Sequence, residues 1–209
     1  ASVLLILGLG WTATSVGLDQ VTLRRDGETI RVEGRVVETA EDGGLLVEGR
    51  DGILWGVQPD ELVEHTKDDA PFEPLSPDDL AKQLRSELPA GFEVLSTKHY
   101  VICYDASRAY AQWCASLFER LYRAFTNFWK LKGFELSEPE LPLVAVVFAD
   151  QAPFVDFSRA EVGDAVETII GYYSFRTNRM VMYDLTGLES LNRYNRGRNA
   201  SSQIKQYLR

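Results

Sequence analysis

Three Asp-Gly pairs constrain the fold of this chain more than any other feature. Asp26-Gly27, Asp42-Gly43 and Asp51-Gly52 each separate two short runs in which apolar and polar residues alternate. Asp and Gly tolerate the positive φ angles of tight turns, and this alternation is typical of a half-buried strand. Residues 20–65 therefore predict a small antiparallel β barrel of four or five strands. Its expected core residues are Val21, Leu23, Ile30, Val32, Val36, Leu46, Ile53 and Trp55.

The segment that follows has a different character. Residues 66–75, TKDDAPFEPL, combine charges with two prolines and lack periodicity, which predicts a linker. Ser76 then marks a helix start, because its hydroxyl can accept a backbone N–H, Pro77 fits the first helical position, and Asp79 sits at the capping-box offset. We therefore assign residues 66–91 to a linker and one short helix.

Residues 92–209 predict a second, α+β domain. FEVLST and HYVICY are strand patterns, and Ser107 can cap a helix that runs to about Leu131. The apolar run LVAVVFA from Leu143 is expected for a central strand covered on both faces, with a short helix over 152–160 after it. Apolar residues at helical spacing predict the core face of the long helix: Tyr110, Trp113, Leu117, Leu121, Ala124, Phe125 and Phe128.

A hairpin closes this pattern over residues 169–184, IIGYYSFRTNRMVMYD. Two apolar-alternating strands flank the polar turn Arg176-Thr177-Asn178. The stretch after Asp184 has little apolar periodicity and predicts a loop. Ser201-Ser202 can then cap a helix, SQIKQYLR, that the end of the sequence interrupts.

These segments resemble a known family. VLSTKHYVICYDAS, AYAQWCASLFERLYRAFTNFWK and LPLVAVVFADQAPFVDF, followed by the hairpin, are similar in order to segments of an uncharacterised family of secreted bacterial proteins described as gluzincin-like zinc metallopeptidases. The resemblance covers residues 20–209 and is strongest over 92–184. It implies an SH3-like barrel followed by a zincin-like α+β domain with a mixed sheet. The family's His-Glu-x-x-His helix would fall just after Arg209, so the domain would be incomplete.

The resemblance also implies a function. The chain would be the N-terminal part of an exported zinc-dependent peptidase that acts on a peptide or protein substrate. Zinc is expected in the complete protein and not in this chain, because His65 and His99 each stand alone and more often serve as hydrogen-bonded structural histidines. No catalytic residue is assigned within the chain, and it is expected to be inactive by itself.

The substrate-binding residues implied by the resemblance lie in the hairpin. They form an edge strand, antiparallel to the substrate, that consists of Arg179, Met180, Val181, Met182 and Tyr183. An unpaired strand edge can bind an extended peptide through its backbone. Tyr172, Tyr173, Arg176 and Arg179 can shape subsites or contact a carboxylate, while an ordinary hairpin with aromatic cross-strand packing explains each residue equally well.

The alternative function is a non-catalytic cell-envelope protein that binds peptides or cell-wall polymers through the barrel or the strand edge. A zinc helix downstream would separate the two hypotheses. Other chemistry finds little support, because Cys103 is too far along its strand from His99 to pair with it. Cys103 and Cys114 are expected to be buried thiols, although an oxidising compartment would allow a disulfide between them.

The N-terminus predicts export. The apolar run SVLLILGLGW precedes the small and polar stretch TATSVG, which fits a partial signal peptide over residues 1–18. The protein would then be periplasmic, cell-envelope or extracellular. The run is too short for a stable membrane span, and the alternatives are a buried first strand or a truncated anchor.

The charge of the chain argues against nucleic acid as a partner. The formal net charge is −9, and residues 176–209 carry seven Lys and Arg against two Asp and Glu, whereas residues 1–175 carry 15 against 29. Nucleic-acid binding needs clustered Lys and Arg against the phosphates.

Overall fold

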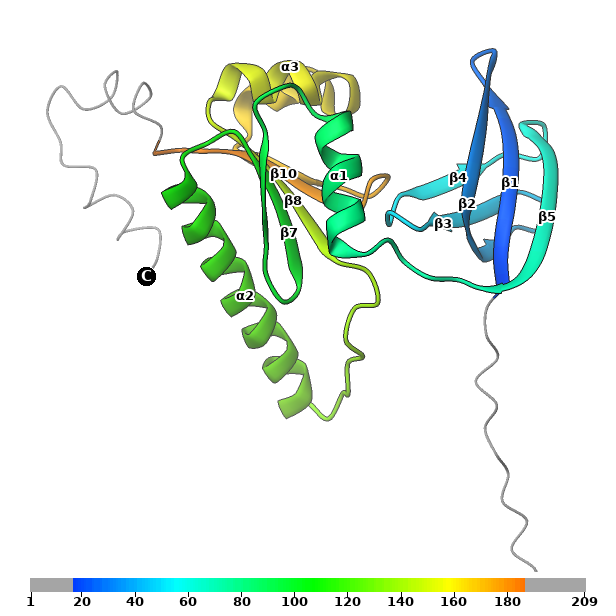
Figure 1. Ribbon diagram of the computed structural model, residues 1–209, viewed down its shortest axis with the longest axis horizontal. Helices are drawn as coiled ribbons and strands as arrows, with labels where there is room; N and C mark the ends of the chain where they lie inside the picture. The colour runs from blue at the N-terminus through cyan, green and yellow to red at the C-terminus, as the bar shows by residue number, and fades with distance from the viewer. Residues whose placement is uncertain (1–16, 187–209) are drawn as a thin grey trace, which may run out of the picture. The chain divides into compact units, whose positions relative to one another are not determined.

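The computed structural model describes residues 17–186 and divides the chain into two compact units (Figure 1). Among the described residues, the smaller unit comprises 17–50 and 55–73, and the larger unit comprises 51–54 and 74–186. The α+β class is confirmed, because one unit is a sheet of strands and the other combines a sheet with helices. The predicted signal segment, except for its last two residues, and the helix predicted after Ser201 lie outside the described residues.

The smaller unit is a five-stranded sheet with the order β4-β3-β2-β1-β5. The predicted Asp-Gly turn between β1 and β2 is present, because Asp26 and Gly27 have φ angles of 53° and 82°. Positive φ at both positions is the requirement of a type I′ hairpin turn. The strands are β1 Gly17–Arg25, β2 Glu28–Thr39, β3 Leu45–Gly49, β4 Leu54–Val57 and β5 Leu62–Pro71.

Two predictions for this unit need correction. The linker predicted over 66–75 is largely wrong, because β5 pairs antiparallel with β1 as far as Pro71. Its charged, mostly exposed side chains hid the strand from a hydrophobicity pattern. The closed barrel is not confirmed, since β4 and β5 are the two edges of the sheet and no ladder joins them within residues 17–186.

The core of the smaller unit differs by one position in β3. Leu46, predicted to be buried, is exposed, whereas Leu45 and Val47 are buried. A register irregularity between Val36 and Glu38 of the partner strand accompanies this offset. In a strand, a shift of one residue exchanges the two faces. The buried residues are Val21, Leu23, Val32, Leu45, Val47 and Val57, and Ile30, Val36 and Trp55 pack against them.

The larger unit contains a mixed sheet with the order β6-β7-β8-β10-β9. β7, β8 and β10 run parallel, and β6 and β9 are antiparallel strands at the two edges. The predicted central strand is confirmed, because β8 has neighbours on both sides and is buried along almost its whole length. The strands are β6 Glu93–Ser96, β7 Tyr100–Tyr104, β8 Leu143–Phe148, β9 Gly171–Ser174 and β10 Arg179–Tyr183.

Helices cover both faces of this sheet (Figure 1). α1 (Pro77–Glu87) and α3 (Gln151–Val162) pack on one face, and α2 (Arg108–Leu131) packs on the other. A short 3-10 helix, η1 (Gly163–Thr168), follows α3. Both predicted helix starts are confirmed, because Ser76 Oγ accepts the Asp79 N–H and Ser107 Oγ accepts the Tyr110 N–H, each at 3.2 Å. None of the helices within residues 17–186 is long and apolar enough to cross a membrane.

The part of α2 that is buried against the sheet differs from the predicted core face. Its buried residues are Ala111, Cys114, Ala115 and Phe118. The predicted core face is largely exposed, with 54% of Leu121, 58% of Phe125 and 54% of Phe128 accessible. Phe118 and Phe125 are seven residues apart and therefore lie on nearly the same side of the helix, but only Phe118, in the first half of α2, is buried. The apolar side chains in the second half of α2 are left at the surface of the described unit.

Candidate functional site

The hairpin of β9 and β10 carries every predicted substrate-binding residue. β10, which contains Arg179–Tyr183, pairs with β8 on one side and β9 on the other. The prediction that β10 is the edge strand is therefore wrong, since its backbone groups are already used in two ladders. The edge on this side of the sheet is β9. The hairpin pattern alone could not decide which of its two strands joins β8.

Within residues 17–186, the backbone of β9 has hydrogen-bonding groups at that edge that no strand pairs with. The N–H of Tyr183 donates to the carbonyl of Ile170 at 3.4 Å, which identifies these residues as a hydrogen-bonded pair. Such pairs alternate along an antiparallel ladder. The N–H and C=O groups of Gly171 and Tyr173 therefore point away from β10. Beside them, the side chain of Tyr173 is 47% exposed and that of Phe175 is 83% exposed.

The side chains of β10 divide between the two faces of the sheet. Arg179 and Val181 are buried on the face covered by α1 and α3, whereas Met180 is exposed on the opposite face. Met182 packs only at the margin of the α2 core, and Tyr183 packs against the core beneath α3. Arg179 is the unexpected member, because its cationic side chain is only 8% exposed.

Arg179 lines a cavity of about 430 Å³ on that face. The walls combine an apolar surface from β8, β10 and α3 with polar groups from β9 and the turn. Arg176, predicted with Arg179 to contact a carboxylate, lines the same cavity but is exposed. The lining residues are Val146, Phe157, Ala160, Glu161, Tyr172, Arg176, Thr177, Arg179 and Val181.

The guanidinium of Arg179 is only partly satisfied. Its Nη1 donates to Oε2 of Glu87 at 2.7 Å, and Gln83 holds the other oxygen of that carboxylate at 2.8 Å. The Nε and Nη2 atoms are buried and have no hydrogen-bond partner among the described residues. A buried donor without a partner costs about 1–3 kcal/mol. Glu87 was not predicted, because it lies 92 residues from Arg179.

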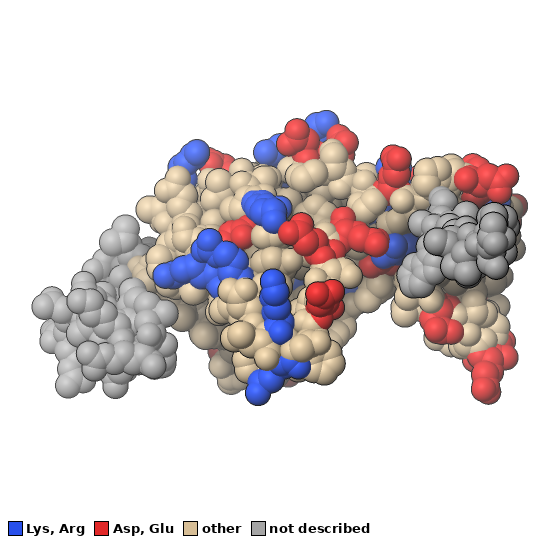
Figure 2. All heavy atoms as spheres, turned by 90° about the horizontal axis from the view of Figure 1, so that it is seen from below, with Lys and Arg blue, Asp and Glu red and all other residues tan. Residues whose placement is uncertain are grey.

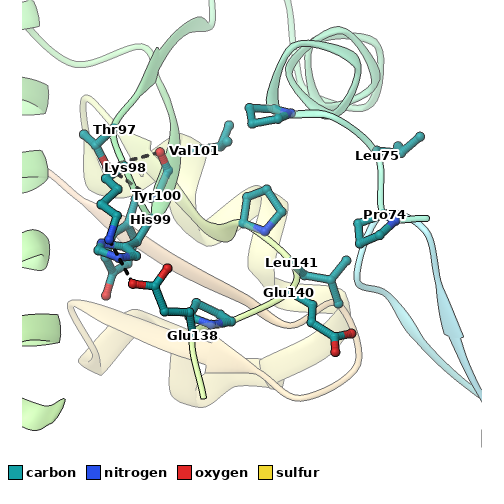
Figure 3. Close-up of a pocket in the computed structure, with 13 residues that line it drawn as sticks. Pro74, Leu75, Thr97, Lys98, His99, Tyr100, Val101, Glu138, Glu140 and Leu141 are labelled. Atoms are coloured by element: carbon teal, nitrogen blue, oxygen red, sulfur yellow. Dashed lines mark hydrogen bonds and ion pairs between the residues drawn. The ribbon is translucent and has the colours of Figure 1, made fainter. Parts of the chain in front are cut away.

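A second hollow of about 350 Å³ lies at the start of β7 and β8 (Figure 3). Thr97, Lys98 and His99 line one side, and the loop with Glu138 and Leu141 lines another. Lys98 Nζ bonds to Glu138 Oε1 at 2.9 Å across the opening. Two exposed, oppositely charged side chains thus already neutralise each other, and we assign no ligand to this hollow.

His99 is fixed by Glu119 of α2. Oε2 of Glu119 lies 2.8 Å from Nδ1 of His99, and Oε1 accepts the His99 backbone N–H at 2.9 Å and the Thr97 hydroxyl at 2.7 Å. The imidazole also stacks on Tyr122, with ring centroids 3.9 Å apart. Burial alone would raise the pKa of Glu119, but the hydrogen bonds from His99 and Thr97 outweigh it and lower the pKa to about 2.

The other predicted polar residues have structural positions. His65 lies in the smaller unit, where its Nε2 is 2.7 Å from Oδ1 of Asp19. Both histidines are thus hydrogen-bonded, as predicted, and the absence of a ligand role for them stays a prediction. Cys103 and Cys114 are free and buried, in cores on opposite faces of the sheet. Burial raises the pKa of Cys103 to about 12 and that of Cys114 to about 11, so neither is a thiolate at neutral pH.

The described surface mixes both signs of charge. On the face shown in Figure 2, Lys and Arg side chains are interspersed with Asp and Glu and separated by uncharged surface. That face therefore has no continuous basic patch that would attract a polyanion. The expectation that nucleic acid is not a partner stays a prediction.

Comparison of the sequence with protein-family models, with curated proteins and with solved structures found no match.

Proposed function

We propose that this chain supplies the substrate-binding sheet of an exported zinc-dependent peptidase, and that an extended peptide adds to the sheet along β9. The observation that carries the proposal is the open edge of β9, where Gly171 and Tyr173 present their N–H and C=O groups outward. Unpaired groups of this kind form a template for an antiparallel strand. The substrate would thus lie one strand further out than the sequence predicted.

No described helix fully covers the α2 side of the sheet over this hairpin. Met180 is 38% exposed and Tyr173 is 47% exposed on the α2 side of the sheet. A further helix packed there would remove this apolar surface from water. The resemblance implies such a helix after Arg209, with the His-Glu-x-x-His ligands, and we propose that it belongs to the complete protein.

The described residues do not fit a zinc ion. They contain no group of three or more His, Cys, Asp or Glu side chains that could hold a metal. The proposal therefore assigns neither zinc binding nor a catalytic step to this chain. Its contribution is to bind and orient an extended backbone.

The edge is tested with two substitutions at one residue. Tyr173→Pro removes one outward N–H without breaking a bond to β10, whereas Tyr173→Ala keeps the N–H and removes the ring. Binding of a pool of labelled octapeptides is measured by fluorescence anisotropy. We expect the proline variant to weaken binding at least about tenfold and the alanine variant to weaken it much less. Equal binding by all three proteins would contradict strand addition at β9.

The enzymatic half of the proposal is tested in the coding DNA that follows Arg209. A His-Glu-x-x-His sequence soon after SQIKQYLR, with a further Glu downstream, would support the peptidase. A stop codon, or a helix without these ligands, would remove the peptidase. Peptide binding at β9 would then favour the non-catalytic cell-envelope protein.

A further inference from the structure

We propose that the Arg179 cavity is a binding site for an organic monocarboxylate that carries an apolar group. The site lies on the sheet face beneath α1 and α3 and uses side chains, whereas the β9 edge uses backbone groups. The inference is thus independent of peptide addition along β9.

The guanidinium of Arg179 leaves two donors for this ligand. Glu87 holds Nη1 at 2.7 Å and so fixes the plane of the group. The Nε–H and one N–H of Nη2 lie parallel on another edge of the guanidinium, and both atoms are buried without a partner in the described structure. A carboxylate that binds them must therefore displace the side chains that cover them. Two parallel donors match the two oxygens of a carboxylate in a bidentate pair.

The rest of the cavity selects the size and charge of the ligand. Its volume of about 430 Å³ falls within the usual range for small-molecule sites. Val146, Phe157, Ala160 and Val181 provide an apolar wall for the body of the ligand. A dianion such as phosphate would lose more hydration free energy than a monocarboxylate on binding beside this apolar wall.

The neighbouring charges also favour a single negative charge on the ligand. Glu87 already neutralises part of Arg179, and Glu161 lines the cavity. Glu161 accepts the Tyr172 hydroxyl at 3.3 Å. Arg176 lines the cavity and is exposed, where it can attract an anion from solution. The site thus combines one buried cation, one exposed cation and two carboxylates.

The first experiment compares phenylacetate with phenylacetamide. The two molecules have nearly the same shape, but only phenylacetate is a carboxylate. Isothermal titration calorimetry on the full chain should show phenylacetate binding at least about tenfold more tightly than the amide. Inorganic phosphate should bind more weakly than phenylacetate. Equal affinity for acid and amide, or tighter binding of phosphate, would overturn the proposal.

Two variants assign that binding to the cavity. Arg179→Lys keeps the positive charge that faces Glu87 but loses the two parallel N–H donors of the guanidinium. It should weaken phenylacetate binding about tenfold or more. Ala160→Phe fills the cavity from the exposed surface of α3 and should abolish binding even if the lysine variant fails to fold. Ala152→Phe, at an exposed alanine of the same helix outside the cavity, is the matched control and should bind normally. Unchanged binding by Ala160→Phe would overturn the proposal.

A further pair of ligands identifies the source of the carboxylate. N-acetyl-Ala-Ala-Phe is compared with its C-terminal amide. Tighter binding of this peptide acid than of phenylacetate would identify a peptide C-terminus as the ligand, and weaker binding would identify a free small acid. Failure of every carboxylate would overturn this site and leave the test of the β9 edge unaffected.

Discussion

At the scale of single residues, Glu119 is the clearest source of pH-dependent stability. Its pKa in the folded chain is about 2, below the ordinary value near 4.5 that it regains on unfolding. A depressed pKa contributes stability that is present above about pH 4.5 and is lost as the pH falls toward 2. We predict that Glu119→Gln flattens this part of the stability profile and lowers stability at pH 7 by about 1–3 kcal/mol.

Urea unfolding at a series of pH values measures this effect. Glu138→Gln is the matched control, because Glu138 has its pKa lowered by Lys98 but is fully exposed on the surface. Solvent screens such a pair, so the control should keep the profile of the original chain. A Glu119→Gln profile that still falls as steeply below pH 4.5 would show that other carboxyl groups dominate.

The chemistry of Arg179 was only half visible in the sequence. Arg176 and Arg179 flank a turn, and a role in carboxylate binding follows from their residue type. The burial of Arg179 does not follow from residue type, because its partner Glu87 lies at the end of a helix 92 residues earlier in the chain. Strand alternation predicts the face of the sheet on which a side chain lies. Which residue it contacts there depends on tertiary packing.

At the scale of elements, α2 shows that an apolar stripe on a helix is not always buried along its whole length. It spans 24 residues, or about 36 Å at the helical rise, whereas β7 and β8 have five and six residues and reach only about 20 Å. Much of the helix therefore extends beyond the strands that it covers. The prediction extended the core face along the whole helix, because a periodic pattern shows which stripe is apolar but not how far along the helix the sheet reaches.

Two phenylalanines two turns apart on α2 test this view. Phe118 is 8% exposed and Phe125 is 58% exposed. We predict that Phe118→Ala lowers the free energy of unfolding by about 3–5 kcal/mol, whereas Phe125→Ala lowers it by less than about 1 kcal/mol. Urea unfolding, followed by circular dichroism, measures both. Equal losses would mean that this side of α2 is covered along its whole length in the folded protein.

At the scale of the whole molecule, local signals predicted the elements better than their pairing. The Asp-Gly turns, the capped helices and the apolar run of β8 depend on neighbouring residues, and each was found. The sheet edges depend on which strands meet after the chain folds. β5 was missed because its side chains are charged and mostly exposed. The order of β9 and β10 was reversed because the sequence of a strand does not show which strand it pairs with.

The metal chemistry belongs to this scale as well. A catalytic zinc usually needs three protein ligands that converge. The sequence contains two histidines, and these bond to carboxylates in different units, His65 to Asp19 and His99 to Glu119. Both cysteines are buried, with pKa values raised to about 12 and about 11. We therefore predict that purified residues 1–209 bind no stoichiometric zinc and hydrolyse no peptide.

Metal analysis after equilibration with zinc and desalting measures this directly, and thermal unfolding with and without EDTA provides an independent readout. We expect the same unfolding temperature in both samples, since ions that bind only the folded state would raise it. One zinc ion per chain, removed by EDTA together with a fall in that temperature and a loss of peptide hydrolysis, would place a metal site inside this chain. The helix proposed after Arg209 would then be unnecessary for catalysis, and the β9 edge would have to be tested as part of an active peptidase.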